Sequence, residues 1–365
     1  MNKRIKLMYL IPHLQNQGPV AQLLSLIRNI DQNQFAPYVV TVFPERDNSL
    51  IEQFRSLCTE VICGNAKKWQ VISQKRHIID AISKVKPDII HSCSTITDGI
   101  CSSISITIPF FITLHNNIVE DVVVQYGKMI GGYMANREKK AILKATSVIT
   151  CSKTLKQQYE KLIPREYIAI PNGIEIEKWE NQTGLDRNGL RLKLNLPMDK
   201  YIIISTGALI ERKNPIMTIE AFEEAKVRNA ILLVLGDGVL YEQCKKVASE
   251  NVIFTGRVSD VKEYLYSSDL FISASNAEGL PYAVLEAMCT GINIVLSNIP
   301  QHKEAVGTNF DKMKFFEVGN KEEEKKCIEY YVNSCNIGRN KYDLGAISAR
   351  TMAKNYMSCY KSICE

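Results

Sequence analysis

The sequence lacks the features that mark several classes of protein. Its eleven cysteines form no Cys-x-x-Cys pair, and their odd number and scatter argue against a disulfide framework or a zinc site and favour a reducing compartment. No apolar run reaches the roughly 20 residues that are needed to span a bilayer. The run from Leu7 to Ile11 stops at Pro12, which suits a first strand better than a secretory signal. These absences predict a cytoplasmic globular protein.

The chain also lacks a general excess of charge. Its net charge of +6 comes from 45 basic and 39 acidic residues, but one window holds the whole excess. Between Tyr126 and Lys161 only Glu138 and Glu160 oppose eight basic residues, which are Lys128, Arg137, Lys139, Lys140, Lys144, Lys153, Lys156 and Lys161. Few aromatic side chains lie between these cations, which argues against nucleic-acid binding. The window is a candidate for binding an anionic membrane surface, and a solvated helix face is the alternative.

What the sequence does contain is a repeated α/β pattern. Its 365 residues exceed one ordinary core and fit two domains. Apolar runs of strand length alternate with helical stretches in both halves, which predicts an α/β fold with two doubly wound parallel sheets. The expected strands are 5–11, 38–43, 88–91, 110–114, 147–150, 167–170, 201–206, 231–235, 252–255, 270–275, 292–296 and 313–317. The expected helices include 20–30, 71–84, 131–144, 153–162, 188–194 and one within 343–365.

The stretch 277–288 lies between two of these strands and has the character of a binding site. Pro281 suits the start of a helix, and the loop before it follows the carboxyl end of a strand, where parallel sheets bind ligands. Free amides at the helix start favour anionic oxygens, and Gly279 allows a close approach. Glu278 then lies at the mouth, with Glu286 about one and a half turns inside the helix. Two carboxylates beside free amides suit a ligand with several hydroxyls and a phosphate.

This stretch resembles the signature of the retaining glycosyltransferases of family 4, which have the GT-B fold of two Rossmann-like domains facing each other across a cleft. The signature is a Glu, seven residues and a second Glu, with Gly-Leu/Phe-Pro after the first. Glu278 and Glu286 match this spacing, and Gly279, Leu280 and Pro281 match the link. The resemblance implies that Glu286 holds the ribose of a nucleotide sugar, and that Glu278 and the following amides hold the sugar ring. A helix N-terminal charge and a solvated helix residue are the alternative.

The loop after strand 201–206 resembles the family loop that meets the pyrophosphate of the donor. The family usually has Gly-Arg at its first two positions and Lys at the seventh. Gly207 and Lys213 match, Ala208 departs from the pattern, and Arg212 can restore the second positive charge. Two cations at a strand end before a helix start are suited to a pyrophosphate. A solvated basic turn is the alternative.

Two further loops resemble donor-binding loops of the family. The backbone near Arg257 and Val258, after strand 252–255, lies by resemblance against the nucleobase. The loop 12–19 contains Gly18, where the family usually has two adjacent glycines close to the donor sugar. Gln17 takes the place of one of them, and a plain strand-to-helix loop is an equal alternative.

His115 follows strand 110–114, where the family commonly has a histidine facing the donor sugar. The resemblance makes it a candidate catalytic residue, and a structural role is the alternative. Asn116 and Asp121 are candidates for contacts with the acceptor.

The resemblance also divides the chain into two domains. Asn172-Gly173 resembles the interdomain segment, and Asn-Gly suits a tight turn or hinge. In GT-B enzymes the last helix returns to the first domain. We therefore expect an acceptor-side domain of residues 1–176 that is completed by 343–365, and a nucleotide-sugar-binding domain of residues 177–342.

The resemblance implies a retaining glycosyltransferase that moves a hexose-type sugar from a UDP or GDP sugar to an acceptor hydroxyl, with Glu278 and His115 at the reacting centre. No Asp-x-Asp motif occurs, which agrees with leaving-group stabilisation without a metal, and no cofactor is expected. The family favours a role in O-antigen, capsule or other surface polysaccharide synthesis, and the basic window adds docking on the inner face of the membrane to reach a lipid-linked glycan acceptor. A nucleotide-sugar epimerase of GT-B fold and a non-catalytic partner subunit are the alternatives, and the departures at Gln17 and Ala208 keep the latter open.

Overall fold

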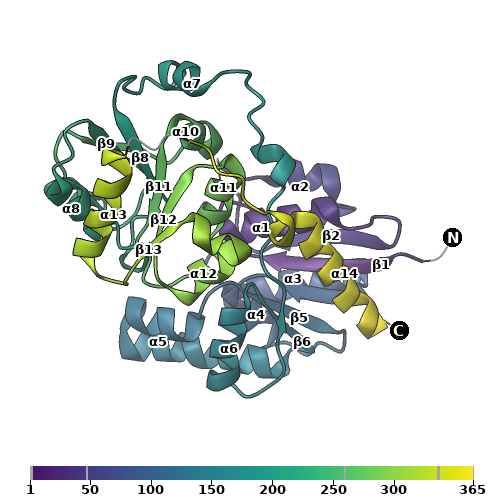
Figure 1. Ribbon diagram of the computed structural model, residues 1–365. Helices are drawn as coiled ribbons and strands as arrows, with labels where there is room; N and C mark the ends of the chain where they lie inside the picture. Colours follow the sequence, from purple (N-terminus) through teal and green to yellow (C-terminus); the bar gives the residue numbers. More distant parts are fainter. Residues whose placement is uncertain (1–2, 47, 259, 335–337, 365) are drawn as a thin grey trace. The chain divides into compact units, whose positions relative to one another are not determined.

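The computed structural model describes residues 3–46, 48–258, 260–334 and 338–364, without the side chains of 118–126. The chain forms two compact units (Figure 1). Unit 1 comprises Met1–Ile174 and Ile347–Glu365, and unit 2 comprises Glu175–Ala346.

Unit 1 is built on a seven-stranded parallel sheet with the strand order β3-β2-β1-β4-β5-β6-β7. Its strands are β1 (Ile5–Ile11), β2 (Phe35–Thr41), β3 (Glu60–Ile62), β4 (Ile89–Ser92), β5 (Phe110–Leu114), β6 (Ser147–Thr150) and β7 (Ile168–Ala169). Its helices are α1 (Gly18–Asn29), α2 (Ile51–Leu57), α3 (Val71–Val85), α4 (Thr95–Cys101), α5 (Ile118–Lys144), α6 (Lys153–Leu162) and α14 (Ala349–Cys364). Strand β1 is a continuous apolar run from Leu7 because a central parallel strand is covered on both faces.

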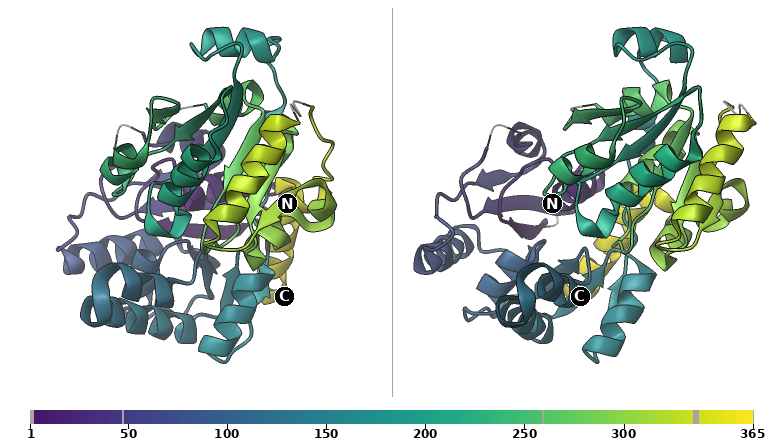
Figure 2. Two further views of the ribbon diagram at one scale, coloured as in Figure 1. Left: turned by 60° about the vertical axis from the view of Figure 1, so that its left-hand side comes forward. Right: turned by 90° about the vertical axis from the view of Figure 1, so that its left-hand side faces the viewer.

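The last helix, α14, packs against α1 and completes the core of unit 1 (Figures 1 and 2). Tyr356 and Tyr360 are fully buried in this core. The Tyr360 hydroxyl lies 2.6 Å from Nδ1 of His91 on β4, and Nε2 of His91 lies 2.7 Å from Oγ1 of Thr113 on β5. Burial lowers the pKa of His91 to about 3, so the ring is neutral at pH 7. Polar contacts therefore fix the C-terminal helix to the centre of the first sheet.

Unit 2 is built on a six-stranded parallel sheet with the strand order β10-β9-β8-β11-β12-β13. Its strands are β8 (Tyr201–Thr206), β9 (Ala230–Leu235), β10 (Val252–Gly256), β11 (Leu270–Ser273), β12 (Asn293–Ser297) and β13 (Lys314–Phe316). Its helices are α7 (Arg187–Lys193), α8 (Pro215–Ala225), α9 (Tyr241–Val247), α10 (Val261–Ser267), α11 (Tyr282–Thr290), α12 (Pro300–Val306) and α13 (Lys321–Asn333). Strands β8 and β11 are neighbours at the centre of this sheet, and the candidate site lies at their carboxyl ends.

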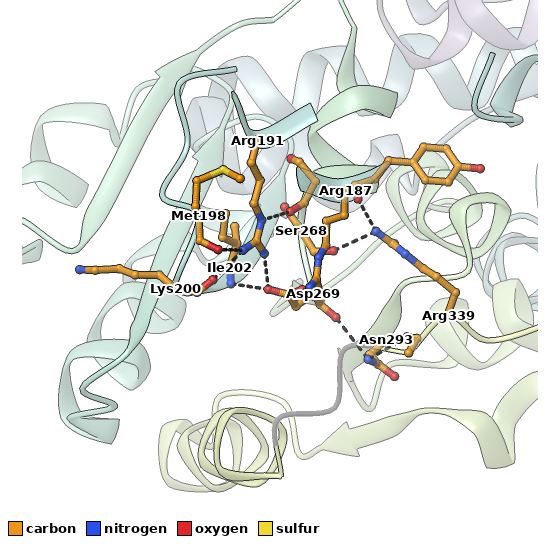
Figure 3. Close-up of polar contacts among 12 residues, drawn as sticks. Arg187, Arg191, Met198, Lys200, Ile202, Ser268, Asp269, Asn293 and Arg339 are labelled. Atoms are coloured by element: carbon orange, nitrogen blue, oxygen red, sulfur yellow. Dashed lines mark hydrogen bonds and ion pairs between the residues drawn. The ribbon is translucent and has the colours of Figure 1, made fainter. Parts of the chain in front are cut away.

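A buried polar network fixes the start of β11 (Figure 3). Asp269 is 3% exposed, and its carboxylate accepts from Nη1 of Arg187 and Nη2 of Arg191 at 2.6 Å each. The backbone N–H of Ile202 on β8 donates to the same carboxylate at 2.8 Å. Arg339 donates to backbone carbonyls in the turn that precedes Asp269, including that of Ser268 at 3.0 Å. The network joins α7 to the amino ends of β8 and β11, and the loops of the site follow the carboxyl ends of these strands.

The predicted α/β class with two Rossmann-like parallel sheets is confirmed. Several elements have no counterpart among the expected ranges: α2, β3, α4, α9, α10, α12 and α13. The helix expected at 131–144 is the second part of the longer α5, in which Gly127 has a non-helical φ of 74°. Within the described residues, every helix is too short or too polar to cross a bilayer.

Candidate functional site

Three glycine-containing loops meet at the carboxyl ends of β8, β9 and β10. Gly207 and Gly236 have φ of 140° and 139°, a region that side chains rarely adopt. A Cβ on Gly236 would lie 1.8 Å from the carbonyl oxygen of Gly207, so only glycine allows the two loops to approach this closely. The N–H of Gly236 donates to the carbonyl of Gly256 at 2.9 Å. The close packing of these three glycine loops forms the base of the candidate site in unit 2.

Arg212 and Lys213 converge on the carboxylate of Glu278. Nη1 of Arg212 lies 2.6 Å from Oε2, and Nζ of Lys213 lies 2.5 Å from Oε1. The Ser275 hydroxyl also donates to Oε1, at 2.7 Å. Burial alone would raise the pKa of Glu278, but Lys213 and Arg212 outweigh it and lower the pKa to about 2. The carboxylate is therefore ionised and holds two cations in one place.

The local sequence explains why these cations face Glu278. A single 3-10 turn, Glu211–Lys213, follows β8, and Asn214 ends it in the left-handed conformation before Pro215 starts α8. The N–H of Asn276 donates to the carbonyl of Arg212 at 2.8 Å. Nη1 of Arg212 in turn donates to the carbonyl of Ala277 at 2.8 Å. The loops after β8 and β11 are thus bonded to each other through their backbones.

Glu286 lies on α11 in the same part of unit 2 and is half-buried. Burial raises its pKa to about 7, and the charge of Lys213 offsets only part of this effect. Its carboxyl therefore lacks the hydration of a surface glutamate, and nearby cations do little to stabilise its ionised form. Glu278 and Glu286 thus have opposite electrostatic character: the first is ionised and paired, and the second is half-protonated near pH 7.

The sequence prediction missed His302, on α12. This side chain is fully buried, and Nδ1 lies 2.9 Å from the carbonyl oxygen of Ser297, while Nε2 lies 3.5 Å from the Ser273 hydroxyl. Burial lowers its pKa to about 4. The charges of Glu278 and Lys213 also act on it, so it lies beside the cation cluster. The available signal was a histidine in a helix that starts at Pro300, directly after β12.

The other predicted residues of unit 2 are arranged around this cluster. Gly279, Leu280 and Pro281 are buried, and α11 begins at Tyr282, one residue later than expected. Arg257 is exposed in the loop after β10, and Val258 follows it. Their predicted role at a nucleobase stays a prediction.

Unit 1 contains a cavity of about 270 Å³ near the carboxyl ends of β1, β4 and β5. His115 and Asn116, both predicted, line it together with Gln17. Burial lowers the pKa of His115 to about 4. Gly18 is the first residue of α1, and a Cβ there would meet nothing within 4 Å. The space around Gly18 therefore does not require a glycine.

The side chain of Asp121 lies outside the described residues. Three titratable residues that the sequence prediction missed also line the cavity: His13, Asp98 and Glu138. Asp98 and Glu138 are hard to recognise from the sequence, because Asp98 follows a Ser/Thr-rich turn and Glu138 stands among basic residues.

Two family models match the chain. Residues 186–343 match the model described as glycosyl transferases group 1, and residues 17–178 match the model described as glycosyltransferase family 4. The two matched ranges correspond to most of unit 2 and most of unit 1.

Several curated relatives are 23% to 28% identical to the chain. TuaC of Bacillus subtilis (strain 168), named for teichuronic acid biosynthesis, is 28% identical over 243 residues, which are 64% of this chain and 59% of that relative. The chain thus spans less than two thirds of that relative's length. An Escherichia coli UDP-Gal:alpha-D-GlcNAc-diphosphoundecaprenol alpha-1,3-galactosyltransferase is 24% identical over 277 residues, covering 72% of this chain and 71% of the relative. The Escherichia coli O-antigen biosynthesis glycosyltransferase WclY is 23% identical, covering 85% and 83%.

Solved structures share the fold. Anabaena HepE in complex with UDP-glucose has a TM-score of 0.79 at 16% identity and covers 98% of this chain and 100% of its own. WaaG, a glycosyltransferase involved in lipopolysaccharide biosynthesis, has a TM-score of 0.73 at 12% identity, with 98% and 95% covered. The two family models together match most of the chain and show that it belongs to the family 4 glycosyltransferases, and the solved structures show the GT-B fold.

Proposed function

We propose that the protein is a retaining glycosyltransferase that moves a hexose-type sugar from a nucleotide-diphosphate sugar, UDP or GDP, to an acceptor hydroxyl. The observation that carries this proposal is the cluster of Arg212 and Lys213 on the buried carboxylate of Glu278. Two fixed cations beside glycine loops can stabilise a departing pyrophosphate by preorganised charge. HepE, a structural neighbour, binds UDP-glucose, and one relative is named for a UDP-galactose donor.

Each carboxyl of the site has a separate role in this proposal. Glu278 stays ionised at neutral pH, so it can stabilise positive charge that develops at the sugar carbon. Glu286 is half-protonated, and hydrogen bonds from two ribose hydroxyls would favour its ionised form. We propose that no metal ion or other cofactor is required, because Arg212 and Lys213 supply two positive charges for the diphosphate. His115 is proposed to contact the sugar from unit 1.

The proposed acceptor is a glycan, and by analogy with the relatives a lipid-linked glycan of surface polysaccharide, O-antigen or lipopolysaccharide synthesis. Two of these relatives are named for teichuronic acid and O-antigen biosynthesis, and the name of the third includes a diphosphoundecaprenol-linked sugar. Asn116, in the cavity of unit 1, and Asp121 stay candidates for acceptor contacts.

The outer face of α5 supports docking on an anionic membrane through the 126–161 window. Met129, Ile130 and Tyr133 are 91%, 62% and 70% exposed, and Lys128 and Lys140 are exposed on the same helix. Apolar side chains between cations suit the lipid interface, where each cation contributes about 1 kcal/mol. Flotation with anionic liposomes should show binding that high salt weakens and that Met129→Ser with Tyr133→Ser abolishes. Leu192→Ser, at an exposed leucine of unit 2, is the matched control; no flotation at low salt would remove the proposal.

The donor is tested by thermal shift with UDP, GDP, ADP and their common sugars. A ligand at about a hundred times its dissociation constant should stabilise the protein by about 2.7 kcal/mol. The shift should be confined to one base and lost in Glu286→Ala, whereas Glu242→Ala, at an exposed glutamate on α9, should keep it. No shift with any nucleotide would contradict the proposal and favour a non-catalytic subunit. An epimerised donor in the absence of an acceptor would instead identify an epimerase.

A further inference from the structure

The cavity of unit 1 contains an unusual pair of acidic side chains. Asp98 on α4 and Glu138 on α5 are each 1% exposed, and the two helices pack against each other. Both residues line the cavity. The two carboxyls share a side-chain hydrogen bond, and among the described residues Oδ1 of Asp98 and both carboxyl oxygens of Glu138 accept none from any other donor. A buried carboxyl oxygen without an outside donor costs stability, so these oxygens point to a ligand that supplies donors.

The surroundings of the pair limit the chemistry of that ligand. Burial raises the pKa of Asp98 well above its usual range, with Glu138 as the next cause, and burial raises the pKa of Glu138 to about 7. The pair therefore holds at least one proton at neutral pH and offers both donors and acceptors. His115 Nε2 and His13 Nδ1, on the same cavity, are also buried and unpartnered among the described residues. Burial lowers the pKa of both histidines, so they too are neutral and offer donors and acceptors.

A cation is already present beside the pair. A Cβ on Gly99 would lie 2.1 Å from Nε of Arg137, so the guanidinium lies directly against the Gly99 backbone, next to Asp98. The charge of Arg137 lowers the pKa of Asp98 and of Glu138, but less than burial raises it. An ammonium ligand would compete with Arg137. A phosphate would place its negative charge against two carboxyl groups, which is unfavourable. A neutral ring with adjacent hydroxyls, which both donate and accept, satisfies the cavity best.

We propose that the carboxyl groups of Asp98 and Glu138 together recognise adjacent hydroxyls of a neutral hexose ring in this cavity and thereby set which epimer is accepted. This rests on the proposed glycosyl transfer and names the group that selects the sugar in unit 1. The ring can belong to the acceptor or to the donor, and the chemistry of recognition is the same. A site that hydrogen-bonds a hydroxyl discriminates strongly against an epimer that leaves its polar groups unpaired.

The first test measures binding of methyl glucoside, methyl galactoside, methyl mannoside and methyl N-acetylglucosaminide by saturation-transfer NMR, beside UDP and UDP-hexoses by calorimetry. One glycoside should bind in preference to its epimers. Asp98→Ala and Glu138→Ala should weaken binding of that glycoside by roughly tenfold or more and reduce its preference over the epimers. UDP binding in unit 2 should be retained. If the donor provides the ring, UDP-hexose should instead lose its advantage over UDP in the same variants.

A second measurement separates recognition from a structural role. Asp98→Asn and Glu138→Gln each remove one ionisable group from this buried acidic pair, so each should raise the melting temperature of the unliganded protein while weakening sugar binding. The control is Glu324→Gln, a buried glutamate with one unpartnered oxygen in unit 2, which should leave sugar binding unchanged. Unchanged binding of methyl glycosides and UDP-hexoses in the Asp98 and Glu138 variants would overturn the proposal. So would a native protein that binds UDP but no hexose ring in either form. Loss of UDP binding alone would count against the proposed function and not against this cavity.

Discussion

Nζ of Lys213 lies 2.5 Å from Oε1 of Glu278, and a Cβ on Gly207 would lie 3.7 Å from Cε of the same lysine. The lysine therefore extends across the glycine loop after β8 to a carboxylate in the loop after β11. Glu278 is almost fully buried, whereas the side chain of Lys213 is 22% exposed. The carboxylate thus holds the cation in place while leaving part of it open to a ligand. This arrangement is suited to an anionic ligand that arrives and departs.

Glu278→Gln should lower both stability and activity. Removing the anion leaves Arg212 and Lys213 without their shared partner, and breaking such a buried pair costs about 3 kcal/mol. The rate of glycosyl transfer should fall by roughly a hundredfold or more because the cations lose their fixed positions. Urea unfolding and a donor-turnover assay measure the two effects. Glu224→Gln, which removes a carboxylate from the exposed pair with Lys321, should cost less than about 1 kcal/mol.

The contribution of Glu278 should also depend on pH in a defined direction. Its pKa of about 2 lies below the ordinary value of about 4.3 expected in the unfolded chain. Its stabilising contribution is therefore complete above that ordinary value and is lost as the pH falls toward 2. The stability difference between native protein and Glu278→Gln should shrink over this acid range. A difference that stays constant down to the acid limit would show that the charge of Glu278 does not stabilise the fold.

Gly236→Ala should disrupt the base of the unit 2 site. The new Cβ would lie 1.8 Å from the carbonyl oxygen of Gly207, and the φ of 139° is unfavourable for alanine. We expect a loss of at least about 3 kcal/mol in unfolding free energy and loss of nucleotide binding. Gly132→Ala is the control, because its Cβ would meet nothing within 4 Å inside α5 and should stabilise the helix by up to about 1 kcal/mol. A Gly236→Ala protein with native stability would mean that the loops can separate at little cost.

Asp269→Asn should destabilise unit 2 far more than the loss of a surface ion pair of α7, the helix whose arginines bind Asp269. Asp269 is 3% exposed and binds Arg187 and Arg191 of α7, so the variant should cost about 3 to 5 kcal/mol. Lys193, also on α7, pairs with Glu263 at 2.6 Å, but its side chain is 50% exposed. Lys193→Ala should therefore cost less than about 1 kcal/mol. Equal losses in chemical denaturation would show that the Asp269 network is no stronger than a surface pair.

The elements that the sequence predicted well are those whose burial leaves a continuous apolar run. β1, β5, β6 and β8 were predicted with the bounds that the structure gives, because both faces of these strands are covered. β3 is a three-residue edge strand with half-buried side chains, so it has no such pattern. α4 begins at a Ser/Thr-rich turn in which the Ser94 hydroxyl accepts from the N–H of Ile96, a pattern typical of loops.

Site residues in loops with a characteristic local pattern could be predicted, whereas residues brought together only by helix or strand packing could not. Glu278 and Lys213 stand in loops whose spacing is characteristic of a family, so their meeting could be expected. Asp98 and Glu138 come from two helices, and only the packing of α4 on α5 makes them neighbours. In the sequence, Glu138 is one acid in a basic window, and nothing local distinguishes a buried carboxyl from a solvated one. His302 was missed for a related reason, because its burial depends on β11 and β12 lying side by side.

Glu324→Gln should stabilise unit 2 at neutral and alkaline pH. Glu324 on α13 is fully buried, accepts a 2.7 Å hydrogen bond from the Thr218 hydroxyl of α8, and has one oxygen without a partner among the described residues. Burial raises its pKa to about 8, above the ordinary value of about 4.3, so the folded state binds its proton more tightly than the unfolded state. The native protein should therefore lose stability as the pH rises through this range, by up to about 1.4 kcal/mol per pH unit.

The glutamine variant carries no titratable group at this position, so its stability should change less over the same range. It should match the native protein at acid pH and exceed it above neutrality. Denaturant unfolding at intervals of pH measures the difference, with Glu250→Gln, at an exposed loop position, as the control that should follow the native curve. Parallel curves for Glu324→Gln and the native protein would show that the carboxyl is hydrated in solution, and that α8 and α13 separate enough to admit water.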